Sequence, residues 1–572
     1  MFKTLLSVCV WTSLAWSSCQ ATDYFSSISG LEHLLNTEHI LLQDLSAQVK
    51  ASRTLLQQLE LELSSIELEH ASAAGDTDNY LTNPINVYRL MKRLHTDWFN
   101  FEQRAHIVNS QLRKFVCRCC LIEPSPYICL FNIDFNITQY HDLHFPSQED
   151  VDGAALALVR LQSTYKLDVA QVAAGILNGI KYGTDMSWQD CFVLGQQLFE
   201  LEDYNNTKVW LRESMERLQR LHPQKQTTAA PPPEPTILNS MEMVAKSLFQ
   251  MGDFDTAYEL SQRVLELDPA RKRNWQPGSK VDWPAAAQSG RTETTETSTQ
   301  LWVEQPKQPA DYQLSEEFAH YEKVCRGEVQ PTPAKQRQLR CRYSRGTQAF
   351  GLLAPHKLEE YSLEPLVLSY HDMLPASSLA QLRQMATPHM KRSTVNSVPG
   401  AGQRQKSAFR VSKNAWLPYS THPLMQRMLR DVGAASGLDM TYCEQLQVAN
   451  YGVGGHYEPH WDFFRNAQHY PPEEGNRMAT AIFYLSEVEQ GGATAFPFLD
   501  FAVRPQQGSV LFWYNLHRSS DMDFRTKHAG CPVLKGSKWI ANIWIHEATQ
   551  TFARPCDLYR DNEISLEYQT IK

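Results

Sequence analysis

The last third of the chain consists of short aromatic and β-branched runs that Gly and Pro interrupt at close intervals. Such runs occupy residues 477–497, 509–515, 528–539 and 543–547. Runs of this length and composition, bounded by turn residues, are typical of strands in a sandwich or a barrel. We therefore expect a β domain in this region, and its strands limit where the functional side chains can lie.

Two histidines and one aspartate stand out in this region. The stretch 450–463 reads N-Y-G-V-G-G-H-Y-E-P-H-W-D-F, so His460 and Asp462 form an H-x-D pair, and His528 opens a later run. Two imidazoles and one carboxylate leave one face of a metal open, as in non-haem Fe(II) oxygenases. The motif alone is a weak signal, and the strand-rich surroundings strengthen it. His456 is interpreted as a loop residue, because Asp462 pairs with His460.

A lysine, Lys538, lies in the same late run as His528. A buried ammonium group in a barrel needs an anion, because an unpaired buried charge is very costly. The far carboxylate of a dicarboxylic acid is a suitable anion. The pattern therefore predicts a pocket for such an acid beside the metal site.

The stretch from about 341 to 556 resembles the catalytic domain of collagen prolyl 4-hydroxylase α subunits, and the rest of the chain also fits that family. The resemblance is carried by H-Y-E-P-H-W-D, R-M-A-T-A-I-F-Y-L-S-E-V-E-Q-G-G-A-T-A-F-P and H-A-G-C-P-V-L-K-G-S-K-W. It implies an Fe(II)- and 2-oxoglutarate-dependent dioxygenase on a double-stranded β-helix (jelly-roll) core, with L-ascorbate to rescue oxidised iron. It makes Lys538 the residue that binds the C5 carboxylate of 2-oxoglutarate, and it assigns the iron ligands as His460, Asp462 and His528.

The resemblance assigns further roles around the same centre. Tyr451 and Thr494 match hydrogen-bonding companions of the co-substrate. Residues near the substrate and the reacting centre are Tyr457, Arg477, Trp544 and His546. By spacing alone His546 would be a core histidine, and Trp513 is interpreted as an ordinary core aromatic. The implied reaction hydroxylates C4 of a peptidyl proline with O₂ as a second co-substrate.

Length and charge restrict the class of protein. The chain has 572 residues, too many for a single core, so several domains are expected. Its net charge is −9. Residues 1–21 carry Lys3, a short apolar run and then small residues, which indicates a secretory signal peptide. No later run is apolar enough to span a bilayer. The basic run 271–273 is short, so we expect a solvated linker and no nucleic-acid partner.

The sequence features and the resemblance together give an order of domains. The order is a signal peptide at 1–21, a helical coiled-coil dimerisation domain at 22–140, a TPR-like peptide-substrate-binding domain at 146–270, a flexible linker at 271–340 and the dioxygenase domain at 341–560.

The dimerisation domain is expected from a heptad pattern. One heptad position holds Leu35, Leu42, Val49, Leu56 and Leu63. Five heptads favour a coiled coil, and the alternative is one long amphipathic helix packed on its own domain. A second helix is expected to begin at Asn83 and Pro84, with the Asn as cap.

Two similar units, at 191–207 and 243–257, have the helix-turn-helix rhythm of tetratricopeptide repeats. The resemblance implies that this domain grips proline-rich strands in a tyrosine-lined groove. Phe199 and Lys246 stand where family members often have tyrosines. We therefore expect weak binding of polyproline-like peptides.

An oxidising compartment allows cysteines to pair. The resemblance implies two disulfides, Cys325–Cys341 and Cys531–Cys556. A further cluster, for which a local or inter-chain disulfide is preferred over a zinc site, consists of Cys117, Cys119, Cys120 and Cys129. Cys191 is interpreted as a buried free thiol on a helix. Asn136 and Asn205 lie in glycosylation sequons.

The chain ends in Q-T-I-K, which is not an endoplasmic-reticulum retention signal. An enzyme that modifies nascent secreted chains must stay in the endoplasmic reticulum lumen, so a partner should hold it there. The resemblance supplies protein disulfide isomerase, the β subunit of an α₂β₂ tetramer.

Two functional hypotheses of different class follow. The first is a procollagen-proline 4-dioxygenase acting on collagen-like secreted chains. The second is a catalytically weak paralogue that serves as a collagen-binding or scaffold subunit, which the altered groove makes conceivable. The complete set of iron and 2-oxoglutarate residues favours the enzyme. An oxygenase for other secreted proteins stays open.

Overall fold

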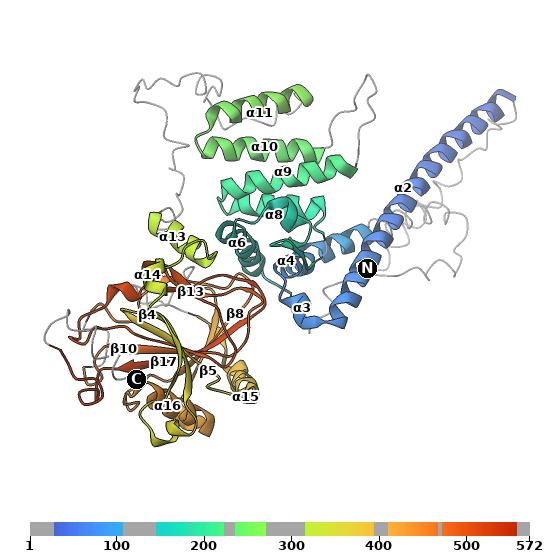
Figure 1. Cartoon of the computed structure of the whole chain (residues 1–572). Coiled ribbons are helices and arrows are strands. Elements are labelled where there is room, and N and C mark those ends of the chain that lie inside the picture. Colours follow the sequence, from blue (N-terminus) through green and yellow to red (C-terminus); the bar gives the residue numbers. More distant parts are fainter. Residues whose placement is uncertain are drawn as a thin grey trace, which may run out of the picture. The chain divides into compact units, whose positions relative to one another are not determined.

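The computed structural model describes residues 28–106, 145–183, 185–221, 235–269, 315–393, 410–466 and 472–557 (Figure 1). These residues form two compact units, one within 1–72 and 96–144 and the other within 73–95 and 145–572. The expected signal peptide, the cysteine cluster at 117–129 and Asn136 lie outside the described residues. Within the described ranges, no helix is long and apolar enough to cross a membrane.

Most of the described part of the first unit is α2 (Ile28–Gly75), a continuous helix of 48 residues. Two leucines of the heptad seam, Leu56 and Leu63, are 45% and 48% exposed. A leucine seam that stays half exposed within one chain fits a coiled coil with a second chain. Dimerisation itself stays a prediction.

The second unit begins with three short helices and one longer helix, α6. They are α3 (Thr77–Leu81) and α4 (Pro84–Lys92), followed by α6 (Gln148–Tyr165) and α7 (Val169–Ala173). Asn83 caps α4 as predicted, since its side chain accepts from the N–H of Ile85 and of Asn86. Ile85 and Tyr88 are fully buried in the core that α4 shares with α6.

Two antiparallel helix hairpins follow, and Figure 1 shows their four helices stacked in order. They are α8 (Trp188–Glu200), α9 (Tyr204–Leu221), α10 (Pro235–Gln250) and α11 (Phe254–Leu267). The capping box of Ser187 begins α8, and the side chain of Asp253 caps α11. The predicted TPR-like rhythm is confirmed, and Cys191 is a buried free thiol on α8, as predicted.

The rest of the second unit contains two antiparallel sheets. The larger has the order β3-β4-β5-β14-β10-β17-β8-β7-β6, and the smaller has the order β13-β12-β15-β9. The strands of the larger sheet are β3 (Cys341–Ser344), β4 (His356–Leu363), β5 (Leu366–His371), β6 (Lys391–Arg392), β7 (Lys413–Leu417), β8 (Leu446–Tyr451), β10 (Arg477–Tyr484), β14 (Val510–Tyr514) and β17 (Lys538–His546). Those of the smaller sheet are β9 (Tyr457–His460), β12 (Thr494–Phe496), β13 (Phe501–Val503) and β15 (His528–Gly530). A separate pair joins β11 (Gln490–Gly491) to β16 (Val533–Lys535).

Strand β14 shows how the sequence builds both faces of the larger sheet. Its alternate residues Phe512 and Tyr514 pack into the core formed with α15 (Ala376–Ala386) and α16 (Pro423–Ser436). Leu511 and Trp513 point the other way, into the core between the two sheets. The predicted two-sheet β domain is confirmed, and Trp513 is a core aromatic, as predicted.

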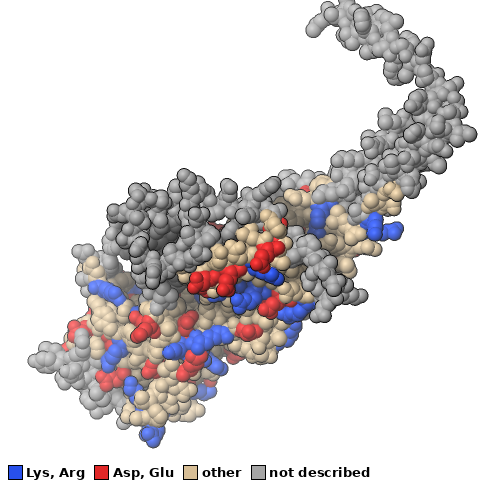
Figure 2. Space-filling view, turned by 90° about the horizontal axis from the view of Figure 1, so that it is seen from above, with Lys and Arg blue, Asp and Glu red and all other residues tan. Residues whose placement is uncertain are grey.

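The described side chains of the face shown in Figure 2 carry both signs of charge, intermixed over the surface. Neither sign dominates the part of this face that the structure describes. This matches the spread-out charge of the sequence.

The two predicted disulfides are wrong in their pairing. Cys325 bonds to Cys531, with the Cα atoms 5.7 Å apart, and Cys341 and Cys556 are exposed free thiols. The reason is the position of α13 (Glu316–Cys325), whose Tyr321 and Val324 pack with residues of β12 and β15. This packing places the last residue of α13 beside the residue that follows β15. Cys341 instead begins β3, the edge strand of the other sheet.

Peptide mapping without reduction should therefore recover a Cys325–Cys531 cross-linked peptide. Cys325→Ser should lower the free energy of unfolding by about 2–5 kcal/mol, because the bond closes a loop of 206 residues. Cys341→Ser is the matched control and should leave the melting temperature unchanged. Recovery of Cys325–Cys341 and Cys531–Cys556 peptides instead would contradict this packing of α13.

Candidate functional site

The three predicted metal-binding residues come together on neighbouring strands of the smaller sheet. His460 ends β9, His528 begins β15, and the two are directly paired in the antiparallel register. Asp462 follows just beyond β9. One potential ligand atom from each residue lies within 4.8 Å of the other two. Within the described residues this is the group of His, Cys, Asp or Glu side chains that could hold a metal ion, and His456 is not part of it.

Backbone carbonyls orient both imidazoles. Nδ1 of His460 lies 2.8 Å from the carbonyl oxygen of Glu458, and Nδ1 of His528 lies 3.1 Å from that of Thr526. With the Nδ1–H groups donating to these carbonyls, each Nε2 keeps its lone pair. Both Nε2 atoms face the Asp462 carboxylate. The distance from His460 Nε2 to Asp462 Oδ1 is 3.8 Å, and that from His528 Nε2 to Asp462 Oδ2 is 3.5 Å. The rings therefore present metal-binding nitrogens to one point.

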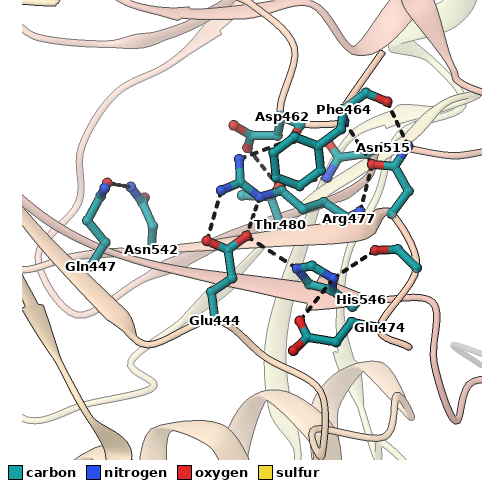
Figure 3. Close-up of polar contacts among 12 residues, drawn as sticks. Glu444, Gln447, Asp462, Phe464, Glu474, Arg477, Thr480, Asn515, Asn542 and His546 are labelled. Atoms are coloured by element: carbon teal, nitrogen blue, oxygen red, sulfur yellow. Dashed lines mark hydrogen bonds and ion pairs between the residues drawn. The ribbon is translucent and has the colours of Figure 1, made fainter. Parts of the chain in front are cut away.

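A chain of hydrogen bonds orients the carboxylate. Thr480 Oγ1 donates to Asp462 Oδ2 at 2.8 Å, and Asn515 Nδ2 donates to Thr480 Oγ1 at 2.8 Å. Asn515 Oδ1 in turn accepts from Trp513 Nε1 at 2.8 Å. Figure 3 shows the first two of these contacts. The sequence analysis did not predict Thr480 and Asn515; the available signal for Thr480 was a threonine in the apolar middle of strand β10.

The protonation states suit metal binding. Burial lowers the pKa of His460 to about 3, with His528 adding to the effect, so the imidazole is neutral. Burial alone would raise the pKa of Asp462, but His528, His460 and Arg477 lower it to about 2. A neutral imidazole and an ionised carboxylate are the forms that bind a cation.

Lys538 lies at the start of β17, opposite Tyr451 on β8. Its Nζ donates to Thr494 Oγ1 at 3.3 Å, and that hydroxyl lies 2.8 Å from the Tyr484 hydroxyl. Burial lowers the pKa of Lys538 to about 7. Among the described residues no carboxylate forms an ion pair with it, so the ammonium lacks an anion. The three residues assigned to the co-substrate thus lie together between the sheets.

A second network joins Arg477 and His546 through Glu444 (Figure 3). Trp544 lies against it, and Arg477, His546 and Trp544 are all predicted site residues. Arg477 donates through Nε and Nη2 to the two carboxylate oxygens of Glu444, and through Nη1 to the carbonyl of Asp462 at 3.2 Å. Its guanidinium lies 4.1 Å from the centre of the Trp544 ring. His546 Nε2 lies 3.2 Å from the same Glu444. The sequence analysis did not predict Glu444. The available signal was an acidic residue just before the apolar strand β8.

Tyr457, the remaining predicted site residue, lies against the metal centre. Its ring stacks on His460 with the centroids 3.6 Å apart and the planes 20° from parallel. The Arg410 guanidinium lies 4.7 Å from the Tyr457 ring centre and donates to Gln447 at 2.9 Å. The stacked ring limits the rotation of the His460 imidazole.

Two imidazoles and one carboxylate, beside a buried lysine that lacks an anion, define an Fe(II)- and 2-oxoglutarate-dependent oxygenase, and residues 446–546 match the family model of the 2OG-Fe(II) oxygenase superfamily. Residues 27–179 match the prolyl 4-hydroxylase alpha-subunit N-terminal region, and residues 188–279 match the prolyl 4-hydroxylase peptide-substrate-binding domain. The chain belongs to the prolyl 4-hydroxylase α-subunit family, as the motifs predicted.

The similarity to individual relatives extends over nearly the whole chain. Prolyl 4-hydroxylase subunit alpha-2 of Gallus gallus is 34% identical over 541 residues, which cover 93% of this chain and 95% of the relative. Subunit alpha-1 of Homo sapiens is 33% identical over 542 residues, with 94% and 96% covered. A viral collagen prolyl hydroxylase from Paramecium Bursaria Chlorella virus-1, solved with 2OG, covers 32% of this chain and 95% of its own, at 24% identity and a TM-score of 0.26.

The pKa of Lys538 predicts how co-substrate use depends on pH. Binding the C5 carboxylate requires the ammonium form of Lys538. The fraction of this form decreases as the pH rises above the Lys538 pKa of about 7. The KM for 2-oxoglutarate should therefore be constant below that pH and rise by up to about tenfold per pH unit above it.

Lys538→Arg should flatten this rise, because a guanidinium stays charged, while its different shape raises the KM at neutral pH. Lys535→Arg is the matched control, since Lys535 is also buried but donates to Asn79 and Thr82. Its KM profile should follow the wild type. A wild-type KM that does not change with pH would remove Lys538 from the co-substrate site.

Proposed function

We propose that this chain hydroxylates C4 of peptidyl prolines in collagen-like secreted chains, using Fe(II), 2-oxoglutarate and O₂ and producing succinate and CO₂. The observation that carries the proposal is the convergence of His460, Asp462 and His528 beside Lys538, a buried ammonium with no carboxylate partner in the described structure. Metal ligands and an anion receptor in one β domain suit a metal that is chelated by a dicarboxylic 2-oxo acid.

The donor set fits the iron and the co-substrate. His460 and His528 would bind Fe(II) through Nε2 and Asp462 through a carboxylate oxygen, while Thr480 keeps the other oxygen hydrogen-bonded. Lys538 would pair with the C5 carboxylate, and the hydroxyls of Thr494 and Tyr451 would complete its hydrogen bonds. When bound, iron and 2-oxoglutarate supply the oxygen-activating chemistry, and the protein supplies orientation and a dry cavity.

The Arg477 network suits the substrate side of the site. Glu444 accepts from the Arg477 guanidinium and is itself held by His546, so Arg477 and the Trp544 ring beneath it form a rigid wall beside Asp462. The buried indole N–H of Trp544 helps to lower the pKa of the Asp462 carboxylate, but it forms no hydrogen bond of normal geometry. A buried donor of this kind is costly unless it finds an acceptor. A backbone carbonyl of the peptide substrate would serve as that acceptor.

The partner and the compartment follow from the family. We infer assembly with protein disulfide isomerase into an α₂β₂ tetramer in the endoplasmic reticulum lumen, with L-ascorbate to restore oxidised iron. The half-exposed seam of α2 supports contact between two α subunits. The collagen-binding scaffold is the second candidate, and the altered peptide groove is the observation that favours it.

The enzyme is distinguished from the scaffold by turnover. The full chain, co-expressed with protein disulfide isomerase, should decarboxylate 2-oxoglutarate faster when a (Pro-Pro-Gly)-type peptide is added, and the peptide should gain 4-hydroxyproline. His460→Ala, Asp462→Ala, His528→Ala and Asp462→Glu should each abolish this turnover, since each removes or displaces a ligand.

The matched control for these variants is His389→Ala, because His389 is an exposed histidine of the same domain, outside the metal group. It should keep wild-type turnover. Near-normal turnover in any of the ligand variants would refute the metal assignment, and a wild type that binds collagen peptides without turnover would favour the scaffold.

The peptide groove gives a separate prediction. Phe199 packs edge-on against Tyr204, with the ring centroids 5.6 Å apart, and Lys246 is exposed and pairs with Glu242 at 2.9 Å. Lysine offers no ring, and phenylalanine has no hydroxyl to donate to a peptide carbonyl. Phe199→Tyr with Lys246→Tyr should therefore tighten binding of long proline-rich peptides, by about 0.5–1.5 kcal/mol per added contact. Calorimetry that finds no gain would place the groove elsewhere.

A further inference from the structure

Helix α6 is bonded to the peptide-substrate-binding helices along one side. Trp210 Nε1 of α9 donates to Gln162 Oε1 at 2.9 Å. Gln197 Nε2 of α8 donates to Asp152 Oδ1 at 2.7 Å. Both bonds involve residues on the shared, buried side of these helices. A movement of α8 and α9 would therefore act on α6.

The C-terminal half of α6 is bonded to the β domain. Arg160 Nη1 donates to the carbonyl oxygen of Gly454 at 3.1 Å, and the Tyr165 hydroxyl donates to that of Pro532 at 2.5 Å. The approach is close, because a Cβ atom on Gly454 would lie 2.5 Å from Cβ of Ala157. Gly454 also has a φ of +69°, which other residues rarely adopt.

The two segments that α6 contacts are the continuations of the metal-binding strands. Gly454 belongs to the loop that leads into β9, and Pro532 follows the end of β15. The segments are bonded to each other as well: the N–H of Gly454 donates to the Val533 carbonyl at 2.8 Å, and the N–H of Val533 donates to the Gly455 carbonyl at 3.0 Å. Helix α6 therefore holds one junction from which both strands extend.

Arg160 also lies within electrostatic range of the residue that orients an imidazole. Burial lowers the pKa of Arg160 to about 10, and the nearby Tyr321 and Glu458 oppose this effect. The side chain of Glu458 is buried. The carbonyl of Glu458 is the acceptor for Nδ1 of His460, at 2.8 Å. The residue whose charge acts on Arg160 is therefore the one whose carbonyl orients the ring of His460.

We propose that Arg160 and Tyr165 are positioning residues for the iron centre, so that the helices that bind the peptide also set the geometry of His460 and His528. The inference depends on the proposed function only for the identity of the metal and its co-substrate. Loosening α6 would let β9 and β15 shift at the junction, and a metal set tolerates only small displacements. The peptide groove on α8 to α11 would stay intact.

Anaerobic titration of Fe(II) into the full chain with protein disulfide isomerase and saturating 2-oxoglutarate tests this without turnover. The charge-transfer absorption of the iron complex reports the metal affinity. Arg160→Met should raise the midpoint of the titration about five- to tenfold, which is below the effect of losing a direct partner of a ligand. It should lower kcat and leave the affinity for a proline-rich peptide within about twofold of the wild type. Arg160→Lys should restore most of the iron affinity.

Arg217→Met is the matched control. Arg217 is a helix residue that also donates to a backbone carbonyl, that of Met186 at 2.8 Å, but its partners Glu213, Met186 and Ala170 all belong to the helical part of the unit and not to the β domain. It should leave the iron midpoint unchanged. Tyr165→Phe removes a single hydroxyl and should raise the iron midpoint about two- to threefold. This variant tests the proposal if Arg160→Met does not fold.

A wild-type midpoint in Tyr165→Phe or in folded Arg160→Met would overturn the proposal, and so would an equal rise in Arg217→Met. A wild-type chain that binds iron with 2-oxoglutarate but does not hydroxylate peptide would refute the proposed function instead. The comparison of iron midpoints would still decide the role of α6.

Discussion

The pairing of β9 with β15 is the constraint on which the site depends. Antiparallel register places His528 opposite His460, and the turn after β9 brings Asp462 to the same point. A slip of one residue would turn these side chains to the other face of the sheet. Much of the surrounding structure supports this register: carbonyls hold both Nδ1 atoms, and Thr480 of the other sheet holds the carboxylate.

The site also contains buried charge whose stability depends on what binds there. Asp462 remains ionised because its histidine and arginine neighbours outweigh the effect of burial. Among the described residues, Lys538 donates to one hydroxyl, lies near two tyrosine rings and forms no ion pair, and burial depresses its pKa. A buried lysine without an anion is destabilising, so a bound dicarboxylate would offset the free energy that its burial costs. The β domain is thus suited to an anion as well as to a metal.

The helical and β parts of the second unit meet at segments that belong to the site. The segment after β15 contains Cys531, bonded to Cys325 of α13, and Pro532, which accepts from Tyr165 of α6. Arg326 just beyond α13 donates to the carbonyl of Thr164 at the end of α6. Covalent and hydrogen bonds therefore fix the same strand end from two helices. This arrangement is the physical basis for treating α6 as part of the metal site.

The sequence by itself determined the order of the elements and the chemical identity of the centre. Heptad and repeat spacing gave the helices, Asn83 and Pro84 gave a helix start, alternating apolar runs gave the strands, and the H-x-D pair with His528 and Lys538 gave the class of enzyme. Helix and strand signals are local in the sequence, and the metal-binding and anion-binding residues are side-chain types that an Fe(II)- and 2-oxoglutarate-dependent oxygenase requires.

The tertiary structure alone decided which distant residues become neighbours. Glu444 between Arg477 and His546, Thr480 beside Asp462, and Cys325 bonded to Cys531 each join segments that are far apart in the chain. Nothing in the local pattern selects such a partner, because the choice depends on how sheets and helices pack. The resemblance predicted disulfides between cysteines close in sequence, and the packing of α13 against β15 decided otherwise.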